Sequence, residues 1–116
     1  NILLVSGLID RLKADTADIV SVVSTAGTKP TNEFVYGPSK WAMRGFTLGL
    51  QQELKPTKCR VLSICPGGIS TGLFEKAGSH IDTTTFMDPA EVAKLIKQLL
   101  DLPKNMEVSE IVINRK

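Results

Sequence analysis

Three short apolar runs rich in β-branched residues, each separated from the next by more than 30 residues, most constrain the fold of this chain. They lie at residues 17–24, 59–65 and 108–114. The segments between them space their apolar residues as helices do, and strands that alternate with helices are typical of βαβ units. The sequence therefore predicts an α/β fold with a parallel sheet. The first run lacks polar alternation, so we expect that strand to be covered on both faces.

The helices are predicted before and between these strands. The first covers residues 2–13, the second runs from about 35 to 55, and residues 71–77 form a short helix. Pro38 fits only the first turn of the second helix, whereas Asp88 and Pro89 predict the capped start of a further long helix. The residues expected on the buried helix faces are Leu4, Leu8, Ile9 and Leu12, then Ala42, Met43, Phe46, Leu50 and Leu54, and finally Val92, Leu95, Ile96, Leu99 and Leu100.

Composition excludes several classes of protein. The chain has 116 residues and a net charge of +2, without a run of five like charges, which gives no electrostatic footprint for nucleic acid or an anionic membrane. No apolar stretch approaches the roughly 18 residues of a membrane span, and no signal peptide opens the chain. Cys59 and Cys65 lie at the two ends of one predicted strand, about 20 Å apart. This distance is too long for a disulfide, so we expect both to be free thiols. We therefore expect a single cytoplasmic domain.

Tyr36, the only tyrosine, and Lys40 are four residues apart on one predicted helix. Side chains at that spacing share a helix face. A phenol with an ordinary pKa of about 10 exchanges protons poorly near neutrality, and a nearby ammonium favours the phenolate. Such a tyrosine can give a proton to a carbonyl oxygen, or remove one from an alcohol, while a hydride moves to or from the carbon. The same pair is also common on solvated helices, so its context decides.

Two further motifs follow predicted strands, at the edge where parallel α/β sheets bind ligands. Ser24 ends the first strand and precedes the tripeptide TAG. Its hydroxyl could hold a reacting oxygen against Tyr36, or could only bond local backbone at the strand end. The segment PGGIST at 66–71 follows the second strand, where glycine lets the backbone approach a ligand closely. An ordinary turn would also suit these residues.

Together these motifs resemble those of the short-chain dehydrogenase/reductase family. The family's Tyr-x-x-x-Lys resembles YGPSK at 36–40, and its Ser-x-Ala-Gly strand end resembles STAG at 24–27. The serine precedes the tyrosine by twelve residues, close to the usual separation. The family's Pro-Gly-x-x-x-Thr resembles PGGIST at 66–71. Three motifs in this order are far more specific than any one of them, and the resemblance covers essentially the whole chain.

The resemblance implies a Rossmann-like doubly wound parallel sheet, of which the chain forms the C-terminal portion with about three strands and their flanking helices. The family's glycine-rich phosphate-binding turn and its Asn-Asn-Ala-Gly strand do not occur in the sequence. We therefore expect residues 1–116 to be the catalytic half of a single domain whose N-terminal cofactor-binding half is absent. The C-terminal segments look most similar to members that use NADP, which favours NADP over NAD as the cofactor.

The resemblance also implies a role for each motif. Tyr36 would be the general acid/base, Lys40 would favour its phenolate and bond the nicotinamide ribose, and Ser24 would orient the substrate oxygen. The expected cofactor contacts are Tyr36, Lys40, Pro66, Gly67, the backbone of Ile69 and the hydroxyl of Thr71. The implied reaction is hydride transfer between NAD(P) and a small carbonyl or alcohol substrate. A hydroxy acid, a sugar, a steroid and an acyl thioester remain open.

The helices at 2–13 and 35–55 are implied to form a homodimer or homotetramer, since Gly45 and Gly49 would allow close helix contact. An alternative function is therefore a catalytically silent interaction domain, which associates stably without binding nicotinamide. A hydrolase has little support because the only histidine, His80, lies in a loop and the sequence has no Gly-x-Ser-x-Gly motif. A single histidine likewise argues against a zinc site, and no metal is expected.

Overall fold

The computed structural model describes all 116 residues and confirms the predicted alternation of helices and strands. A short 3-10 helix, η1, follows the first strand in place of the expected loop. The elements in chain order are α1 (Ile2–Ala14), β1 (Asp18–Val22), η1 (Thr25–Gly27), α2 (Tyr36–Leu54), β2 (Arg60–Pro66), α3 (Leu73–Lys76), α4 (Pro89–Leu100) and β3 (Glu110–Ile113).

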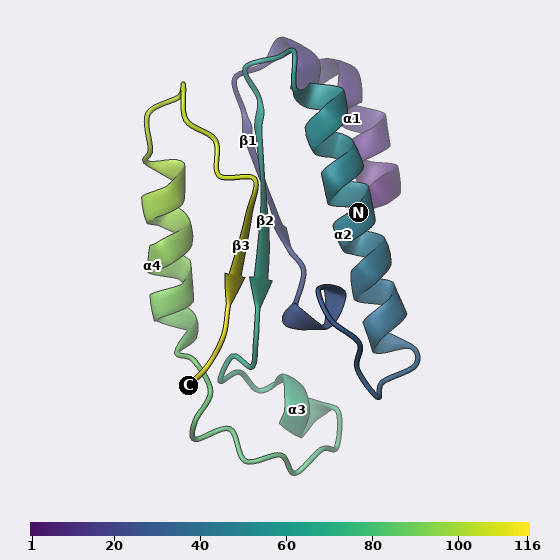
Figure 1. Ribbon diagram of the computed structural model, residues 1–116, viewed down its shortest axis with the longest axis vertical. Helices are drawn as coiled ribbons and strands as arrows, with labels where there is room; N and C mark the ends of the chain where they lie inside the picture. The colour runs from purple at the N-terminus through teal and green to yellow at the C-terminus, as the bar shows by residue number, and fades with distance from the viewer.

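The three strands form one parallel sheet in the order β1-β2-β3. Val20 pairs with Leu62 on one side of β2, and Ile111 pairs with Ile64 on the other. Figure 1 shows α1 and α2 on one face of the sheet and α4 on the opposite face. Helices on both faces of a parallel sheet define a Rossmann-like doubly wound α/β arrangement, as predicted.

The core lies along β2, which is buried over its whole length. Leu50 and Leu54 of α2 pack there with Cys59 and Val61. Burying such aliphatic side chains contributes about 1.5–3 kcal/mol each, which makes the contact between α2 and β2 a main source of stability. Both cysteines are buried free thiols, which confirms that prediction.

The buried faces of α1 and α2 differ in part from the prediction. Leu4 and Leu8 are exposed, the former by 67%, and the core is contacted instead by Val5, Ile9 and Leu12. The helix carries apolar residues on two neighbouring stripes, and only one of them can face the sheet. In α2, Ala42 is exposed, whereas Thr47 is fully buried and its hydroxyl donates a hydrogen bond to the Met43 carbonyl.

The expectation that β1 is covered on both faces is wrong at its end, where Val22 is 50% exposed. β1 is an edge strand, so only β2 has a neighbour on both sides. The helix starts agree with the sequence, since Pro38 lies in the first turn of α2 and the Asp88 carboxylate accepts a hydrogen bond from the Ala90 amide. No helix has both the length and the apolar character that crossing a membrane requires.

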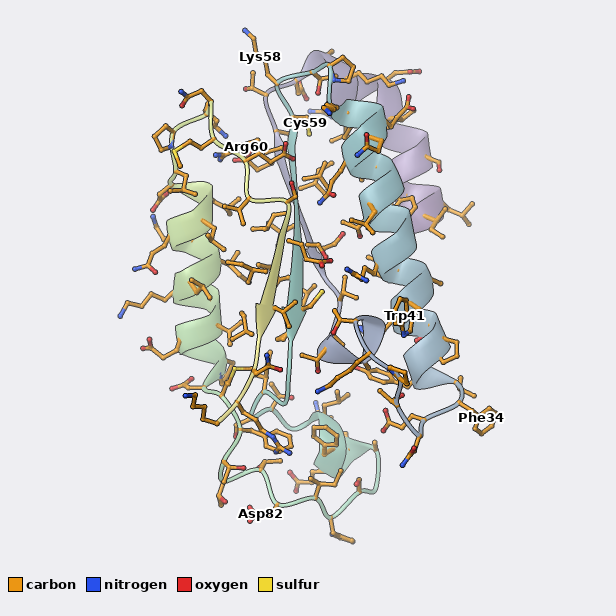
Figure 2. The ribbon with its side chains drawn as sticks, in the orientation of Figure 1. Phe34, Trp41, Lys58, Cys59, Arg60 and Asp82 are labelled. Atoms are coloured by element: carbon orange, nitrogen blue, oxygen red, sulfur yellow. The ribbon has the colours of Figure 1, made fainter.

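Arg60 ties the amino end of the sheet together and is only 9% exposed. Its Nε and Nη2 donate to the two carboxylate oxygens of Asp18 over 2.8 and 3.0 Å. Its Nη2 and Nη1 also donate to the carbonyls of Leu100 and Leu102 at the end of α4. Figure 2 shows Arg60 where the strands begin, beside the connection that follows α4. One side chain therefore links β1, β2 and α4.

Candidate functional site

The carboxyl ends of β1 and β2 meet at one edge of the sheet, where η1 follows the first strand and the loop to α3 follows the second (Figure 1). A cavity of about 400 Å³ lies at this edge. Its lining brings together every site residue predicted from the sequence, namely Ser24, Tyr36, Lys40, Pro66, Gly67, Ile69 and Thr71. These residues come from three separate segments of the chain.

Ser24 is held at the end of β1 by a local hydrogen bond. Its Oγ accepts a bond of 3.1 Å from the Ala26 amide, the strand-end role that the sequence left open. This bond uses an acceptor site of the hydroxyl and leaves its hydrogen to be donated. A Cβ built on Gly27 would lie 2.8 Å from the Lys40 carbonyl oxygen, so the backbones of η1 and α2 touch here. This contact fixes the position of Ser24 relative to Lys40.

Tyr36 is the first residue of α2, and Lys40 follows one turn later on the same face, as the spacing predicts. The Lys40 Nζ lies 5.5 Å from the centre of the Tyr36 ring. Gly37, the residue after Tyr36, is buried. A Cβ at this position would come within 2.7 Å of the Thr31 hydroxyl oxygen. The loop that precedes α2 thus packs against its first turn while the Tyr36 side chain stays accessible at the cavity.

The loop after β2 is anchored at several points. The Gly67 amide donates to the Ile113 carbonyl over 2.8 Å, and the Met87 amide donates to the Gly68 carbonyl over 3.0 Å. Ile69 pairs with Met87 in an isolated parallel bridge. The Thr71 hydroxyl accepts from the Leu73 amide at 3.4 Å, at the start of α3. Main-chain hydrogen bonds therefore anchor the loop after β2, which lines one side of the cavity.

A second cavity of about 370 Å³ adjoins the first and also contains residues outside the predicted site. Phe74 and Phe86 meet edge to face with ring centres 5.5 Å apart, and the Arg115 guanidinium lies 4.6 Å from the Phe86 ring. Lys29 lines both cavities. None of these residues belongs to a recognisable motif. Arg115 follows β3 at the carboxyl edge of the sheet, and that position alone could have indicated it.

The fold and this edge define a Rossmann-like α/β protein with a ligand cavity at the carboxyl ends of its strands, where such sheets bind small molecules. The sequence model of the family described as short chain dehydrogenase matches residues 2–82. The chain therefore belongs to the short-chain dehydrogenase family.

Similar proteins agree with this membership. An uncharacterized oxidoreductase of Staphylococcus epidermidis is 30% identical over 103 residues, which are 88% of this chain and 44% of that protein. The crystal structure of a β-ketoacyl-[ACP] reductase from Bacteroides thetaiotaomicron has a TM-score of 0.78 at 28% identity, over 97% of this chain and 47% of that chain. A serine dehydrogenase complexed with NADP+ has a TM-score of 0.75 at 26% identity, over 96% and 48%. The chain thus spans about half the length of the relatives that it matches.

Proposed function

We propose that this chain carries the proton-transfer site of an NAD(P)-dependent oxidoreductase that interconverts a carbonyl and an alcohol. The observation that carries the proposal is the convergence of Ser24, Tyr36, Lys40 and the loop 66–71 on one cavity. The relatives support the same class of reaction, since they are named as an oxidoreductase, a reductase and a dehydrogenase complexed with NADP+.

In the direction of reduction, the Tyr36 hydroxyl gives its proton to the substrate carbonyl oxygen as the carbonyl carbon accepts a hydride. Ser24 donates its hydroxyl hydrogen to the same oxygen, because its Oγ is already held by the Ala26 amide. The Lys40 ammonium, whose Nζ lies 5.5 Å from the centre of the Tyr36 ring, is the cation next to the phenolate that remains. In the direction of oxidation, that phenolate removes the proton of the alcohol.

The cavity suits a nicotinamide ring and its ribose. Its volume of about 400 Å³ is typical of small-molecule sites, and Lys40 forms none of the ion pairs of the chain, which leaves its ammonium for ribose hydroxyls. Pro66, Gly67, Ile69 and Thr71 would hold the nicotinamide. When bound, the nicotinamide supplies or accepts the hydride. Similar structures include a serine dehydrogenase complexed with NADP+ and a 4-hydroxyisoleucine dehydrogenase complexed with NADH, so relatives of this chain use either cofactor.

We also propose that residues 1–116 correspond to the catalytic half of a single Rossmann domain. The chain spans 44% of the staphylococcal relative and 47% of the β-ketoacyl-[ACP] reductase. The glycine-rich turn that binds the dinucleotide phosphates in this family does not occur in the sequence. The open edge of β1, with Val22 half exposed, is a place where a further strand could pair.

The decisive test of the catalytic role is Tyr36→Phe, which removes only the phenolic oxygen. In the full-length protein, turnover should fall by about 10²- to 10⁴-fold, as for the loss of a general acid. NADPH fluorescence measured in parallel separates this loss from any weakening of the cofactor contact proposed for Tyr36. Phe34→Leu is the matched control, because Phe34 is 88% exposed and points away from the chain in the loop before α2 (Figure 2). Full turnover by the Tyr36→Phe variant would exclude the proposed mechanism.

A homodimer or homotetramer through α1 and α2 completes the proposal. Several apolar side chains on these helices are exposed, among them Leu4, Leu8 and Leu48. The positions above Gly45 and Gly49 are open, which would let a second helix approach. Leu4→Glu should lower the mass measured by light scattering, whereas Ile81→Glu, on an exposed loop, should leave it unchanged. A full-length protein that forms a stable oligomer but binds no nicotinamide would instead identify a silent interaction domain.

A further inference from the structure

Positive charge gathers around the second cavity. Lys29 and Arg115 line it, Lys40 lines the adjoining cavity, and Glu33 is the only carboxylate in the lining of either. None of the three cations takes part in the ion pairs of the chain. A concave site lined by one sign of charge concentrates ligands of the opposite sign. The two cavities together therefore favour an anion.

Arg115 differs from the other three arginines in that it does not pair with a carboxylate of the chain. Arg44 and Arg60 each form a bidentate pair with a carboxylate, and Arg11 pairs with Asp15. Arg115 has no carboxylate partner in the chain, although its planar fork suits a carboxylate better than any other cationic side chain does. It contacts the face of the Phe86 ring instead.

The backbone of Arg115 lies beside the loop 66–71. The Gly67 amide bonds to the Ile113 carbonyl, and a Cβ on Gly67 would lie 3.7 Å from the Arg115 amide nitrogen. Figure 1 shows the C-terminal end of the chain next to the segment that follows β2. The cavity thus combines an apolar aromatic wall with a cation whose backbone lies next to the proposed nicotinamide loop.

We propose that Arg115, assisted by Lys29, binds a carboxylate of the substrate, and that the protein therefore acts on a small hydroxy or oxo acid. This inference rests on the proposed function and narrows its substrate class. The five residues shared by the two cavities, Thr25, Lys29, Gly67, Gly68 and Phe74, connect the carboxylate site to the cavity of Tyr36 and Ser24. The apolar body of the acid would lie against Phe74 and Phe86.

The same cations could serve the phosphates of the cofactor, which present the same oxyanion chemistry. Removing the cation would affect a different binding affinity in each case, that of the substrate or that of the cofactor. A substrate site changes the affinity for the acid and leaves that for NADPH unchanged, whereas a phosphate site changes the affinity for NADPH with every substrate. Measuring both affinities in one variant therefore separates them.

The test uses Arg115→Gln, with Lys116→Gln as matched control because Lys116 is the neighbouring cation and does not line the cavity. The probes are a small hydroxy acid and its primary amide, which share a shape but differ in charge. Arg115→Gln should raise the KM of the acid by about 10- to 100-fold, as for a lost charged hydrogen bond, with little change in kcat or for the amide. Arg115→Lys should restore part of the preference for the acid.

Direct binding separates this inference from the proposed function. Titration of the acid and the amide, followed by NMR, needs no turnover. Binding that favours the acid and depends on Arg115 would uphold the carboxylate site even if Tyr36→Phe showed the proposed mechanism to be wrong. Equal losses for acid and amide, no loss at all, or weaker NADPH binding with an unchanged response to the acid would each overturn the carboxylate assignment.

Discussion

Replacing Arg60 by Met should destabilise the protein more than any change to its exposed ion pairs. Methionine keeps much of the apolar stem but removes every donor. The hydrogen bonds to both oxygens of Asp18 are then lost, together with those to the carbonyls of Leu100, Leu102 and Met106. These bonds join β1, β2 and the segment after α4, so the loss affects the whole amino end of the sheet.

The size of the effect follows from the pKa of Asp18. Hydrogen bonds from Arg60, with a smaller contribution from Lys104, lower the pKa of Asp18 from 3.8 to about 2. At about 1.4 kcal/mol per pKa unit, this shift corresponds to roughly 2 kcal/mol of stability. Leaving one partner of a buried pair alone costs about 3–5 kcal/mol in general. Because Lys104 still pairs with Asp18, we expect a loss of about 2–4 kcal/mol.

Urea unfolding followed by circular dichroism measures this loss. The matched control is Arg11→Met, since Arg11 is an exposed arginine whose carboxylate partner lies 3.5 Å away. Surface pairs of this kind contribute about 0–1 kcal/mol, so the control should unfold nearly like the wild type. A free energy of unfolding for Arg60→Met within about 0.5 kcal/mol of the control would refute the reasoning.

The pH dependence gives a second check on the same pair. The folded-state pKa of Asp18 is depressed, so its contribution is fully present above the unfolded value of 3.8 and is lost as the pH falls toward about 2. The difference in unfolding free energy between the wild type and Arg60→Met should therefore shrink by up to about 2 kcal/mol over that range. The difference in unfolding free energy should change mainly over the roughly two pH units between the unfolded and the folded pKa of Asp18. A difference that stays constant between about pH 5 and pH 2 would contradict the assignment.

Two other changes test the packing at the site and the pairing between α2 and β3. Gly27→Ala should cost about 1–3 kcal/mol in thermal unfolding, because its Cβ would lie 2.8 Å from the Lys40 carbonyl oxygen. Gly7→Ala, in open space within α1, should instead stabilise by about 0.5–1 kcal/mol. Equal effects of the two alanines would argue against the contact. Glu110→Gln weakens the bidentate pair with Arg44, whose hydrogen bonds lower the pKa of Glu110, and should cost about 1–3 kcal/mol at neutral pH. This cost should diminish as acid protonates the wild-type carboxylate, and a cost independent of pH would count against the pair.

The order and type of the elements could be predicted because the signals for them are local. Pro38 and Pro89 can occupy only first turns, and Asp88 caps the following amides, so each marks a helix start within a residue or two. The choice of buried stripe on α1 is not local. Val5 and Ile9 face the core while Leu4 and Leu8 do not, and hydrophobicity alone does not rank the two stripes.

The same distinction holds for the sheet and the site. The exposure of Val22 depends on strand order, which a β-branched run does not encode. The predicted site residues meet because each motif follows a strand, and the carboxyl ends of parallel strands share one edge. The second cavity could not be predicted in this way, because it depends on a contact between segments that are farther apart in the sequence. Phe86 reaches it because Met87 returns to pair with Ile69, and no motif announces that return.

The two ends of the sheet use their cations differently. At the amino end, Arg60 is saturated by a carboxylate and by carbonyls, so its charge serves the fold. At the carboxyl end, Lys40 and Arg115 have no carboxylate partner and line cavities, so their charge is left for ligands. Substitutions at the two ends should therefore separate stability from turnover. Arg60→Met should lower the unfolding free energy yet retain turnover at temperatures where the protein is folded, whereas Arg115→Gln should unfold like the wild type and lose its preference for an anionic substrate.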